Sequence, residues 1–321
     1  MNPPTPLWLD CDPGHDDAMA IILAGKLQPQ RQTTRYIDSR NAAIVLKAAG
    51  MEGIRVVPGQ TKPITRSPLP CPDIHGETGL DGPMGLPLFD PTLVLSDEKA
   101  VLYLGRLLQT RKDKGEPPLT LIATGPLTNY ALLLTLYPEL HNQIKQIIFM
   151  GGSIGPGNWT PCAEFNILVD PEAVSIVLHS GIDVTMVPLE VTHQAIITDA
   201  IIQRLQTQLK GSKFSAVLVD LLLFFKKTYQ DVFDFQHGPP LHDPCTVALL
   251  CAPELFTCKR MGVHVITADG PCLGQTICDI YAKTDSPKIN VATDIKVDGF
   301  MDMLLDAFDQ ANQHTPLNIT V

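Results

Sequence analysis

The sequence predicts an α/β fold with a mostly parallel, mixed central sheet flanked by helices. The first observation is that short apolar runs, typical of buried strands, alternate with longer helical patterns through the middle of the chain. The second is that Gly or Pro ends several of these runs, where a strand must turn towards a helix. Right-handed crossovers of this kind place helices on the faces of a parallel sheet. We expect residues 1–321 to form a single domain.

The composition indicates a globular protein with ample core. Of the 321 residues, 45% are hydrophobic and 18% are charged, and the formal net charge is −10. We therefore expect neither nucleic acid nor a membrane surface as a partner, because a phosphate backbone requires a basic surface. The charge suits a neutral small-molecule ligand.

The eight cysteines indicate a reducing compartment. They show no CxxC pair and no His/Cys cluster, so we expect buried free thiols and neither zinc ligands nor a disulfide framework. The N-terminus has no basic and apolar leader, and the longest apolar stretch, residues 221–225, is too short to span a bilayer. We predict a cytoplasmic protein.

The first strand and helix are predicted within residues 6–27. Residues 7–9 form an apolar run that suits a buried strand, and Pro13 and Gly14 prevent the strand from continuing. Good helix formers follow, so we expect a helix from Asp16 to about Lys26.

Four carboxylates lie at this junction, namely Asp10, Asp12, Asp16 and Asp17. Acids placed so close together repel one another unless a cation lies among them, and oxygen ligands favour Ca²⁺ or Mg²⁺ over zinc. One or two of them could instead be simple helix N-caps.

The remaining elements are predicted in order along the chain. We expect helices at residues 36–50, 101–111, 127–136, 171–179, 199–209, 214–229 and 299–311, with another after residue 243, and strands at 54–57, 119–123, 144–150, 182–189 and between 260 and 291. Residues 61–91, rich in Pro and Gly, are predicted to form a long functional loop. Ligands of such sheets bind beyond the carboxyl ends of the strands, so Asp12, Thr124 and Met150 are expected to converge.

Residues 10–17 read Asp-Cys-Asp-Pro-Gly-His-Asp-Asp, which closely resembles the signature of the inosine–uridine-preferring nucleoside hydrolases. Similar segments recur in family order at residues 74–77, 123–129, 149–152, 163–166, 191–194 and 241–245. The resemblance covers nearly the whole chain and is greatest to fungal-type uridine nucleosidases and ribonucleoside hydrolases. It implies a nucleoside hydrolase-like fold.

The resemblance also implies an activity and its residues. The reaction is hydrolysis of the N-glycosidic bond of ribonucleosides to free base and ribose by a calcium-bound water. The implied Ca²⁺ ligands are Asp12, Asp17, the backbone carbonyl of Thr124, and Asp243. Asp12 is also the implied general base, and His242 the group that protonates the leaving base. The implied substrate-binding residues are Asp16, His75, Met150, Asn158, Glu164 and Asn166.

Two further properties follow from the resemblance. Uridine is the favoured substrate, because Tyr229 and residues 238–241 look like those of pyrimidine-preferring members. A homo-oligomer, either a dimer or a tetramer, is expected.

One segment departs from the family pattern. Residues 27–35 are polar and contain no strand-like run, although a βαβ unit needs a second strand there. About ten residues are absent, so one early strand is expected to be missing beside the first strand. Arg31 stands where family members carry the Asn of a Gly-Asn pair. The chain could therefore be an active hydrolase, an impaired or inactive member that retains only ribose or nucleoside binding, a splice or gene-model variant, or a different metal-dependent hydrolase on the same Asp framework.

Overall fold

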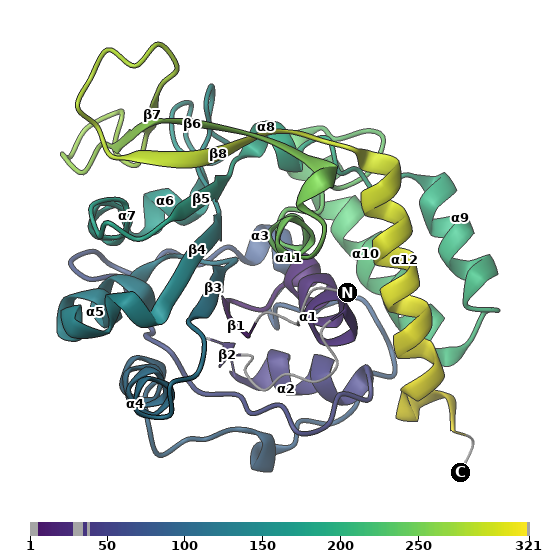
Figure 1. The fold of residues 1–321 in the computed structure, drawn as a ribbon. Coiled ribbons are helices and arrows are strands. Elements are labelled where there is room, and N and C mark those ends of the chain that lie inside the picture. Colours follow the sequence, from purple (N-terminus) through teal and green to yellow (C-terminus); the bar gives the residue numbers. More distant parts are fainter. Residues whose placement is uncertain (1–5, 28–34, 37–38, 320–321) are drawn as a thin grey trace.

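The computed structural model describes residues 6–27, 35–36 and 39–319 and shows the predicted fold class (Figure 1). Its centre is an eight-stranded sheet in the order β2-β1-β3-β4-β5-β8-β6-β7. The first six strands of this order, which ends with β8, run parallel to one another, whereas β6 is antiparallel to both β8 and β7. The strands are β1 (Leu7–Cys11), β2 (Arg35–Tyr36), β3 (Leu119–Ala123), β4 (Ile144–Met150), β5 (Val184–Val187), β6 (Phe256–Val265), β7 (Thr276–Asp279) and β8 (Lys288–Ile295).

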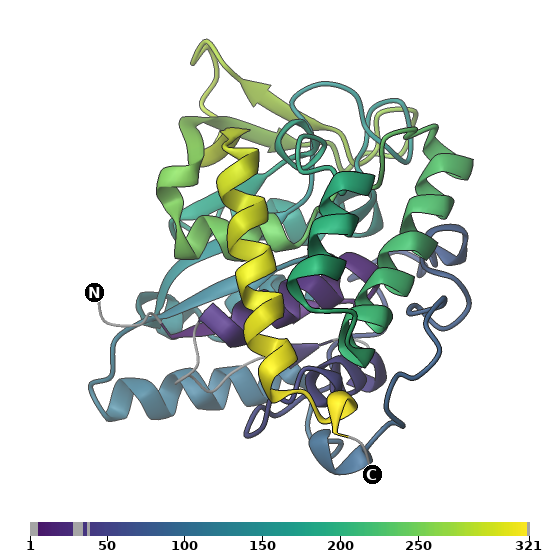
Figure 2. The same cartoon turned by 90° about the vertical axis from the view of Figure 1, so that its right-hand side faces the viewer.

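Helices cover both faces of the sheet. They are α1 (His15–Leu27), α2 (Ser39–Ala48), α3 (Pro72–His75), α4 (Ala100–Asp113), α5 (Thr128–Leu136), α6 (Phe165–Val169), α7 (Pro171–Leu178), α8 (Leu189–Thr192), α9 (Asp199–Gln208), α10 (Lys213–Phe233), α11 (Pro244–Cys251) and α12 (Val297–His314). One apolar cluster joins the sheet to α1, α2, α10, α11 and α12, and a second joins it to α4, α5 and α7. Figure 2 shows α12 in front of α1 on the first of these faces.

Strand β1 alternates between the two clusters. Leu7, Leu9 and Cys11 belong to the cluster around α1, whereas Trp8 belongs to the cluster around α4 and α5. Successive side chains of a strand point to opposite faces, so a strand buried on both faces is apolar throughout. This explains why the run 7–9 could be recognised as a strand from the sequence.

A short strand, β2, occupies the position beside β1 where a strand was expected to be missing. Arg35 and Tyr36 form β2, which pairs in parallel with Asp10 and Cys11. A strand needs only backbone N–H and C=O groups to pair, so a polar segment can supply it without an apolar run. Residues 28–34, and Arg31 with them, lie outside the described residues. The helix expected from residue 36 therefore begins at Ser39, after β2.

Two other expectations are corrected. The predicted strand 54–57 is not part of the sheet, because Val56 forms only an isolated parallel bridge with Val94. Buried thiols were expected throughout, but Cys258 and Cys272 are exposed, and only Cys11 and Cys245 are fully buried among the described residues.

The predicted long loop after residue 61 contains one short helix, α3. No helix in the described part of the chain is long and apolar enough to cross a membrane.

Candidate active site

The carboxyl ends of β1, β3 and β4 converge, as their parallel order requires. Asp12 directly follows β1, Thr124 follows β3, and Met150 is the last residue of β4. Three hydrogen bonds join these ends. The hydroxyl of Thr124 donates a 2.7 Å hydrogen bond to Asp17 Oδ1, and the amide of Asn166 donates to the carbonyl oxygens of Thr124 (2.8 Å) and Met150 (3.4 Å).

A cluster of three buried carboxylates lies at this edge of the sheet. Asp16 and Asp17 open α1, and Asp243 is the residue that precedes α11. One carboxylate oxygen from each lies within 4.8 Å of the others, and the three residues are only 3 to 5% exposed. Asp17 had been predicted as a metal ligand and Asp16 as a ribose contact, so the structure brings both groups to one point.

Backbone and hydroxyl donors fix these carboxylates. Gly14 N–H donates to Asp17 Oδ2 at 3.0 Å, and His242 N–H donates to Asp16 Oδ2 at 3.3 Å. Pro13 and Gly14 therefore do more than end the strand, because the turn they form aims a backbone donor at the cluster. The first turn of α1 adds the positive end of a helix dipole.

The charges of the cluster fit a cation. Burial and the neighbouring charge of Asp17 raise the pKa of Asp16 to about 7. Burial and then the charges of Asp16, Asp17 and Asp12 raise the pKa of Asp243 well above its usual value. Burial also raises the pKa of Asp17. Carboxylates in this state are stabilised by a hard divalent ion, and their all-oxygen donor set matches Ca²⁺ or Mg²⁺.

Asp12 is not part of this group of three carboxylates and lines a pocket beside it. Its side chain is exposed to the pocket, while burial of the carboxyl and the charge of Asp17 raise its pKa well above the ordinary value. Gly125 makes room for it, because a Cβ at that position would lie 2.4 Å from Asp12 Oδ1. Asp12 is thus placed to meet a bound molecule.

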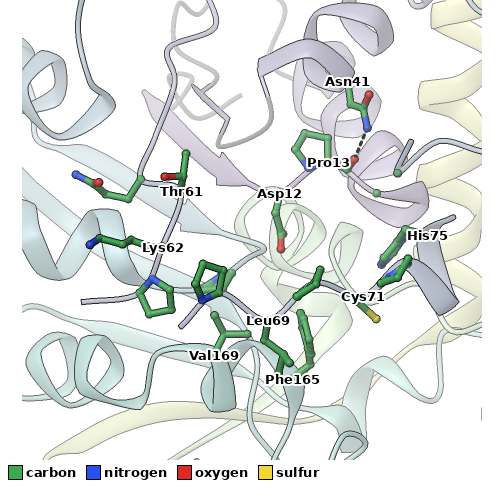
Figure 3. Close-up of a pocket in the computed structure, with 18 of the residues that line it drawn as sticks. Asp12, Pro13, Asn41, Thr61, Lys62, Leu69, Cys71, His75, Phe165 and Val169 are labelled. Atoms are coloured by element: carbon green, nitrogen blue, oxygen red, sulfur yellow. Dashed lines mark hydrogen bonds between the residues drawn. The ribbon is translucent and has the colours of Figure 1, made fainter. Parts of the chain in front are cut away.

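The pocket has a volume of about 440 Å³, which suits a small molecule. It is bounded by the turn after β1, by the loop 60–79 and by α6, and Figure 3 shows Asp12, His75 and Phe165 around it. Asn41 ties two of these segments together, donating to the carbonyl oxygens of Pro13 (3.1 Å) and Thr78 (2.7 Å). No sequence motif singled out Asn41, which follows the shortened segment in α2.

Three of the predicted ribose contacts, Asn158, Glu164 and Asn166, lie on α6 or on the loop that leads into it, whereas Asp16 lies in the first turn of α1. Glu164 is buried and accepts hydrogen bonds from the N–H groups of Gly152 (3.0 Å), Asn166 (2.9 Å) and Ile167 (3.1 Å). Burial raises its pKa to about 7. Asn158 Oδ1 accepts from Phe165 N–H at 3.1 Å, so its side chain folds the loop. Sulfur of Met150 lies 3.5 Å from the Asn166 amide.

His75 lies in a stack of rings at the pocket wall. Its ring packs against His15 with 5.7 Å between centroids and against Phe225 with 5.6 Å. Gly14 permits this approach, since a Cβ there would lie 2.4 Å from His75 Nδ1. Burial and the neighbouring His15 lower the pKa of His75 to about 3, so the ring is neutral.

His242 is held between two hydroxyl groups. Its Nδ1 lies 2.8 Å from Thr192 Oγ1 and its Nε2 lies 2.7 Å from the Tyr229 hydroxyl. Burial, followed by the charge of His193, lowers its pKa well below the ordinary value. Sequence reasoning had singled out His242 without these partners, because each lies on a different element. Thr192 ends α8, and Tyr229 lies on α10.

Asp10, the remaining acid of the motif, faces away from the three-acid cluster. Its Oδ1 accepts a 3.1 Å hydrogen bond from Asn129 on α5, and its buried Oδ2 has no hydrogen-bond partner among the described residues. Burial raises its pKa to about 7. Asp10 therefore supports the strand end and does not contribute an oxygen to the group formed by Asp16, Asp17 and Asp243.

Comparison with known proteins places this site in a family. The model of the family described as inosine-uridine preferring nucleoside hydrolase matches residues 7–302. The pyrimidine-specific ribonucleoside hydrolase RihA of Shewanella woodyi is 42% identical over 314 residues, which are 95% of this chain and 98% of that protein. A probable ribonucleoside hydrolase of Dictyostelium discoideum is 39% identical and covers 96% of each chain.

Solved structures agree. The purine-preferring ribonucleoside hydrolase from Gardnerella vaginalis superposes with a TM-score of 0.84 at 28% identity, covering 96% of this chain and 99% of that one. The plant nucleoside hydrolase PpNRh1 gives 0.82 at 29% identity with the same coverage. The chain therefore belongs to the inosine-uridine preferring nucleoside hydrolases, a family of N-glycosyl hydrolases.

Proposed function

We propose that this chain hydrolyses the N-glycosidic bond of ribonucleosides, with uridine favoured, and that Ca²⁺ is its cofactor. The observation that carries the proposal is the cluster of Asp16, Asp17 and Asp243, whose buried oxygens lie within 4.8 Å of one another beside a pocket that contains Asp12. The pyrimidine-specific relative from Shewanella woodyi supports uridine as the substrate.

The proposed ligands of Ca²⁺ are Asp12, Asp17, the carbonyl oxygen of Thr124, and Asp243. When bound, the ion supplies charge that lowers the pKa of a coordinated water and orients it. The Thr124 carbonyl accepts from Asn166 in this structure and has a second lone pair. The same Asn166 hydrogen bond couples the proposed ribose contacts to the proposed metal ligands.

Asp12 is the proposed general base. The carboxylate is accessible from the pocket, and its raised pKa makes it a stronger proton acceptor than an ordinary aspartate. Asp16, Asn158, Glu164 and Asn166 are the proposed ribose contacts, with Met150 beside the sugar and His75 beside the base. Accepting groups such as these can hold sugar hydroxyls and stabilise the charge that develops on the ring.

His242 is the proposed general acid, acting as a neutral imidazole. Such a ring donates from one nitrogen and accepts at the other. Because a hydroxyl lies at each nitrogen, His242 can release a proton towards one side while it gains one from the other. Tyr229 and Thr192 are therefore proposed positioning residues for this transfer.

A second candidate is an impaired member that binds ribose or nucleoside without turnover. The observation that favours it is the shortened segment 27–35, in which Arg31 stands where family members carry the Asn of a Gly-Asn pair. We also propose a homo-oligomer, either a dimer or a tetramer, on the family likeness. A cytoplasmic location is proposed because no disulfide joins the described cysteines. Sedimentation of the purified chain tests the first, and fractionation of cells tests the second.

The test measures release of uracil and ribose from uridine by the full chain, with Ca²⁺ and with excess chelator, and with inosine as the competing substrate. We expect turnover only with Ca²⁺ and a higher kcat/KM for uridine. The melting temperature should fall on chelation and recover with Ca²⁺, because an ion bound only by the folded state stabilises it. Uridine binding without turnover would support the second candidate, and neither binding nor turnover would reject both.

A further inference from the structure

Two cysteine side chains meet beside the proposed ribose-binding loop. Sγ of Cys162 lies 4.0 Å from Sγ of Cys272, although 110 positions separate them in the sequence. Cys272 is exposed and Cys162 is half-buried. None of the proposed catalytic steps uses either thiol.

The backbone around the two thiols holds them together. Ala163, the residue after Cys162, forms an antiparallel bridge with Gln275. The N–H of Gln275 donates to the carbonyl oxygen of Cys272 at 3.0 Å, which closes a tight turn around that cysteine. Thr160 Oγ1 accepts from the N–H groups of Cys162 (3.3 Å) and Ala163 (2.9 Å). The proximity of the sulfurs therefore follows from paired backbone on both sides.

We propose that Cys162 and Cys272 are an oxidation site at which a peroxide forms a reversible intramolecular disulfide. The sulfurs must approach from 4.0 Å to about 2.05 Å, so forming the bond draws the segment of Cys162 and the turn of Cys272 towards each other. Neither sulfur belongs to the acid cluster or the pocket lining.

The chemistry balances without further groups. The exposed Cys272 thiolate attacks one oxygen of hydrogen peroxide, the O–O bond breaks, and a sulfenic acid and hydroxide result. The Cys162 sulfur then attacks the Cys272 sulfur, the S–O bond breaks, and water leaves as the S–S bond forms. The two thiols lose two electrons and the peroxide gains them. Burial, with the contact to Cys272, raises the pKa of Cys162, which favours Cys272 as the first to react.

The expected consequence rests on the proposed function. Cys162 stands two residues before Glu164 and four before Asn166, and the N–H groups of Trp159 and Thr160 both donate to the carbonyl oxygen of Ala163. Drawing Cys162 towards Cys272 therefore moves the loop that carries the proposed ribose contacts. We expect oxidation to raise KM for uridine severalfold and to change kcat less, with recovery on reduction.

The test treats the reduced full chain with hydrogen peroxide at low excess. We expect the mass to fall by two hydrogens, two thiols to disappear, and digestion to release a peptide that joins Cys162 to Cys272; dithiothreitol should reverse all three. Cys162→Ser and Cys272→Ser should each abolish the linked peptide. Cys258→Ser, at another exposed cysteine, is the matched control and should leave it unchanged.

Absence of the linked peptide in the unmodified chain, whether because Cys272 goes on to sulfinic acid or because other cysteines pair, would overturn the proposal. The mass measurement is independent of turnover, so a chain without hydrolase activity can still form or fail to form the bond. Linkage without a change in KM would overturn the effect on the ribose loop and leave the oxidation site supported.

Discussion

Strand β1 has two unlike neighbours. On one side, Leu7 to Asp10 pair in register with four residues of β3, Thr120 to Ala123. On the other side, the described residues of β2, Arg35 and Tyr36, pair with Asp10 and Cys11. Both neighbours thus reach the carboxyl end of β1, where Asp12 leaves the sheet. The comparison teaches that, in the described part of the chain, the shortened segment keeps its pairing with β1 at the end of the strand where the site is built.

The largest effect is expected at that shared end. Asp12→Asn keeps the size of the side chain but removes the proposed base and one charge of the proposed metal site. We expect kcat for uridine to fall by about 10²- to 10⁴-fold, the usual contribution of a positioned acid or base. The melting temperature in chelator should not fall, because a raised pKa means that the charged form is already disfavoured in the folded protein.

The control for Asp12→Asn is Asp97→Asn, a change at an exposed aspartate outside the pocket lining. It should leave kcat unchanged. Equal activity of Asp12→Asn and the unmodified chain would remove Asp12 from the mechanism.

A second prediction concerns an insertion into the shortened segment beside β1. Inserting a roughly ten-residue segment that ends in Gly-Asn between Pro29 and Gln32, in place of Arg31, should lengthen the partner of β1. An added hydrogen bond contributes about 0.5 to 1.5 kcal/mol, and 1 kcal/mol corresponds to about 2 to 4 °C in chains of roughly 150 to 250 residues. We expect the melting temperature to rise by several degrees and uridine hydrolysis to rise about tenfold or more, equivalent to about 1.4 kcal/mol.

A Gly/Ser insertion of the same length at the same point is the matched control and should give neither gain. If the unmodified chain already hydrolyses uridine as fast as the variant with the inserted strand, the shortened segment is sufficient for activity. The second candidate function would then lose its support.

The third effect is on stability, not on turnover, and is expected at Glu164. Its pKa is raised from 4.5 to about 7, so the folded protein holds a proton that the unfolded chain releases between these pH values. This contribution to stability is fully present below pH 4.5 and is lost by about pH 7, a difference of about 3 kcal/mol. Urea unfolding in chelator should therefore show stability falling with rising pH, and Glu164→Gln should flatten that fall.

Glu139→Gln, at an exposed position, should keep the full pH dependence. The effects of Glu164→Gln and of the inserted strand should add, because the two changes lie on different segments, and Glu164 accepts hydrogen bonds from Gly152, Asn166 and Ile167. A strong departure from additivity would mean that the flank beside β1 and the ribose loop are coupled.

Sequence reasoning was most accurate where residues are buried on both sides. The predicted strands 119–123 and 144–150 coincide with β3 and β4, because apolar runs between turn residues have few alternatives. The run 54–57 has the same character, yet Val56 pairs only with Val94 outside the sheet. Val56 and Val57 are buried in the two apolar clusters without joining the sheet, and the sequence does not distinguish such burial from burial in a sheet.

The site was predictable to the extent that it lies in contiguous motifs. The acids of residues 10–17 and Asp243 were identified, and the structure brings Asp16, Asp17 and Asp243 together. Contacts made across the fold were not predictable, because their partners lie far apart in sequence. Thr192, for example, is 50 positions from His242. The pair Cys162 and Cys272 escaped notice for the same reason.

The alternation of side chains along β1 has one more consequence, for fidelity of folding. Trp8 belongs to one apolar cluster and Leu7, Leu9 and Cys11 to the other, while Asp10 reaches Asn129 on the Trp8 side. A slip of one residue against β3 would exchange these sets and bury acids among aliphatic side chains. Such a misaligned chain would be compact, but the residues of the candidate active site would not come together. The pairing of β2 with Asp10 and Cys11 therefore helps to fix the register of β1 in the sheet.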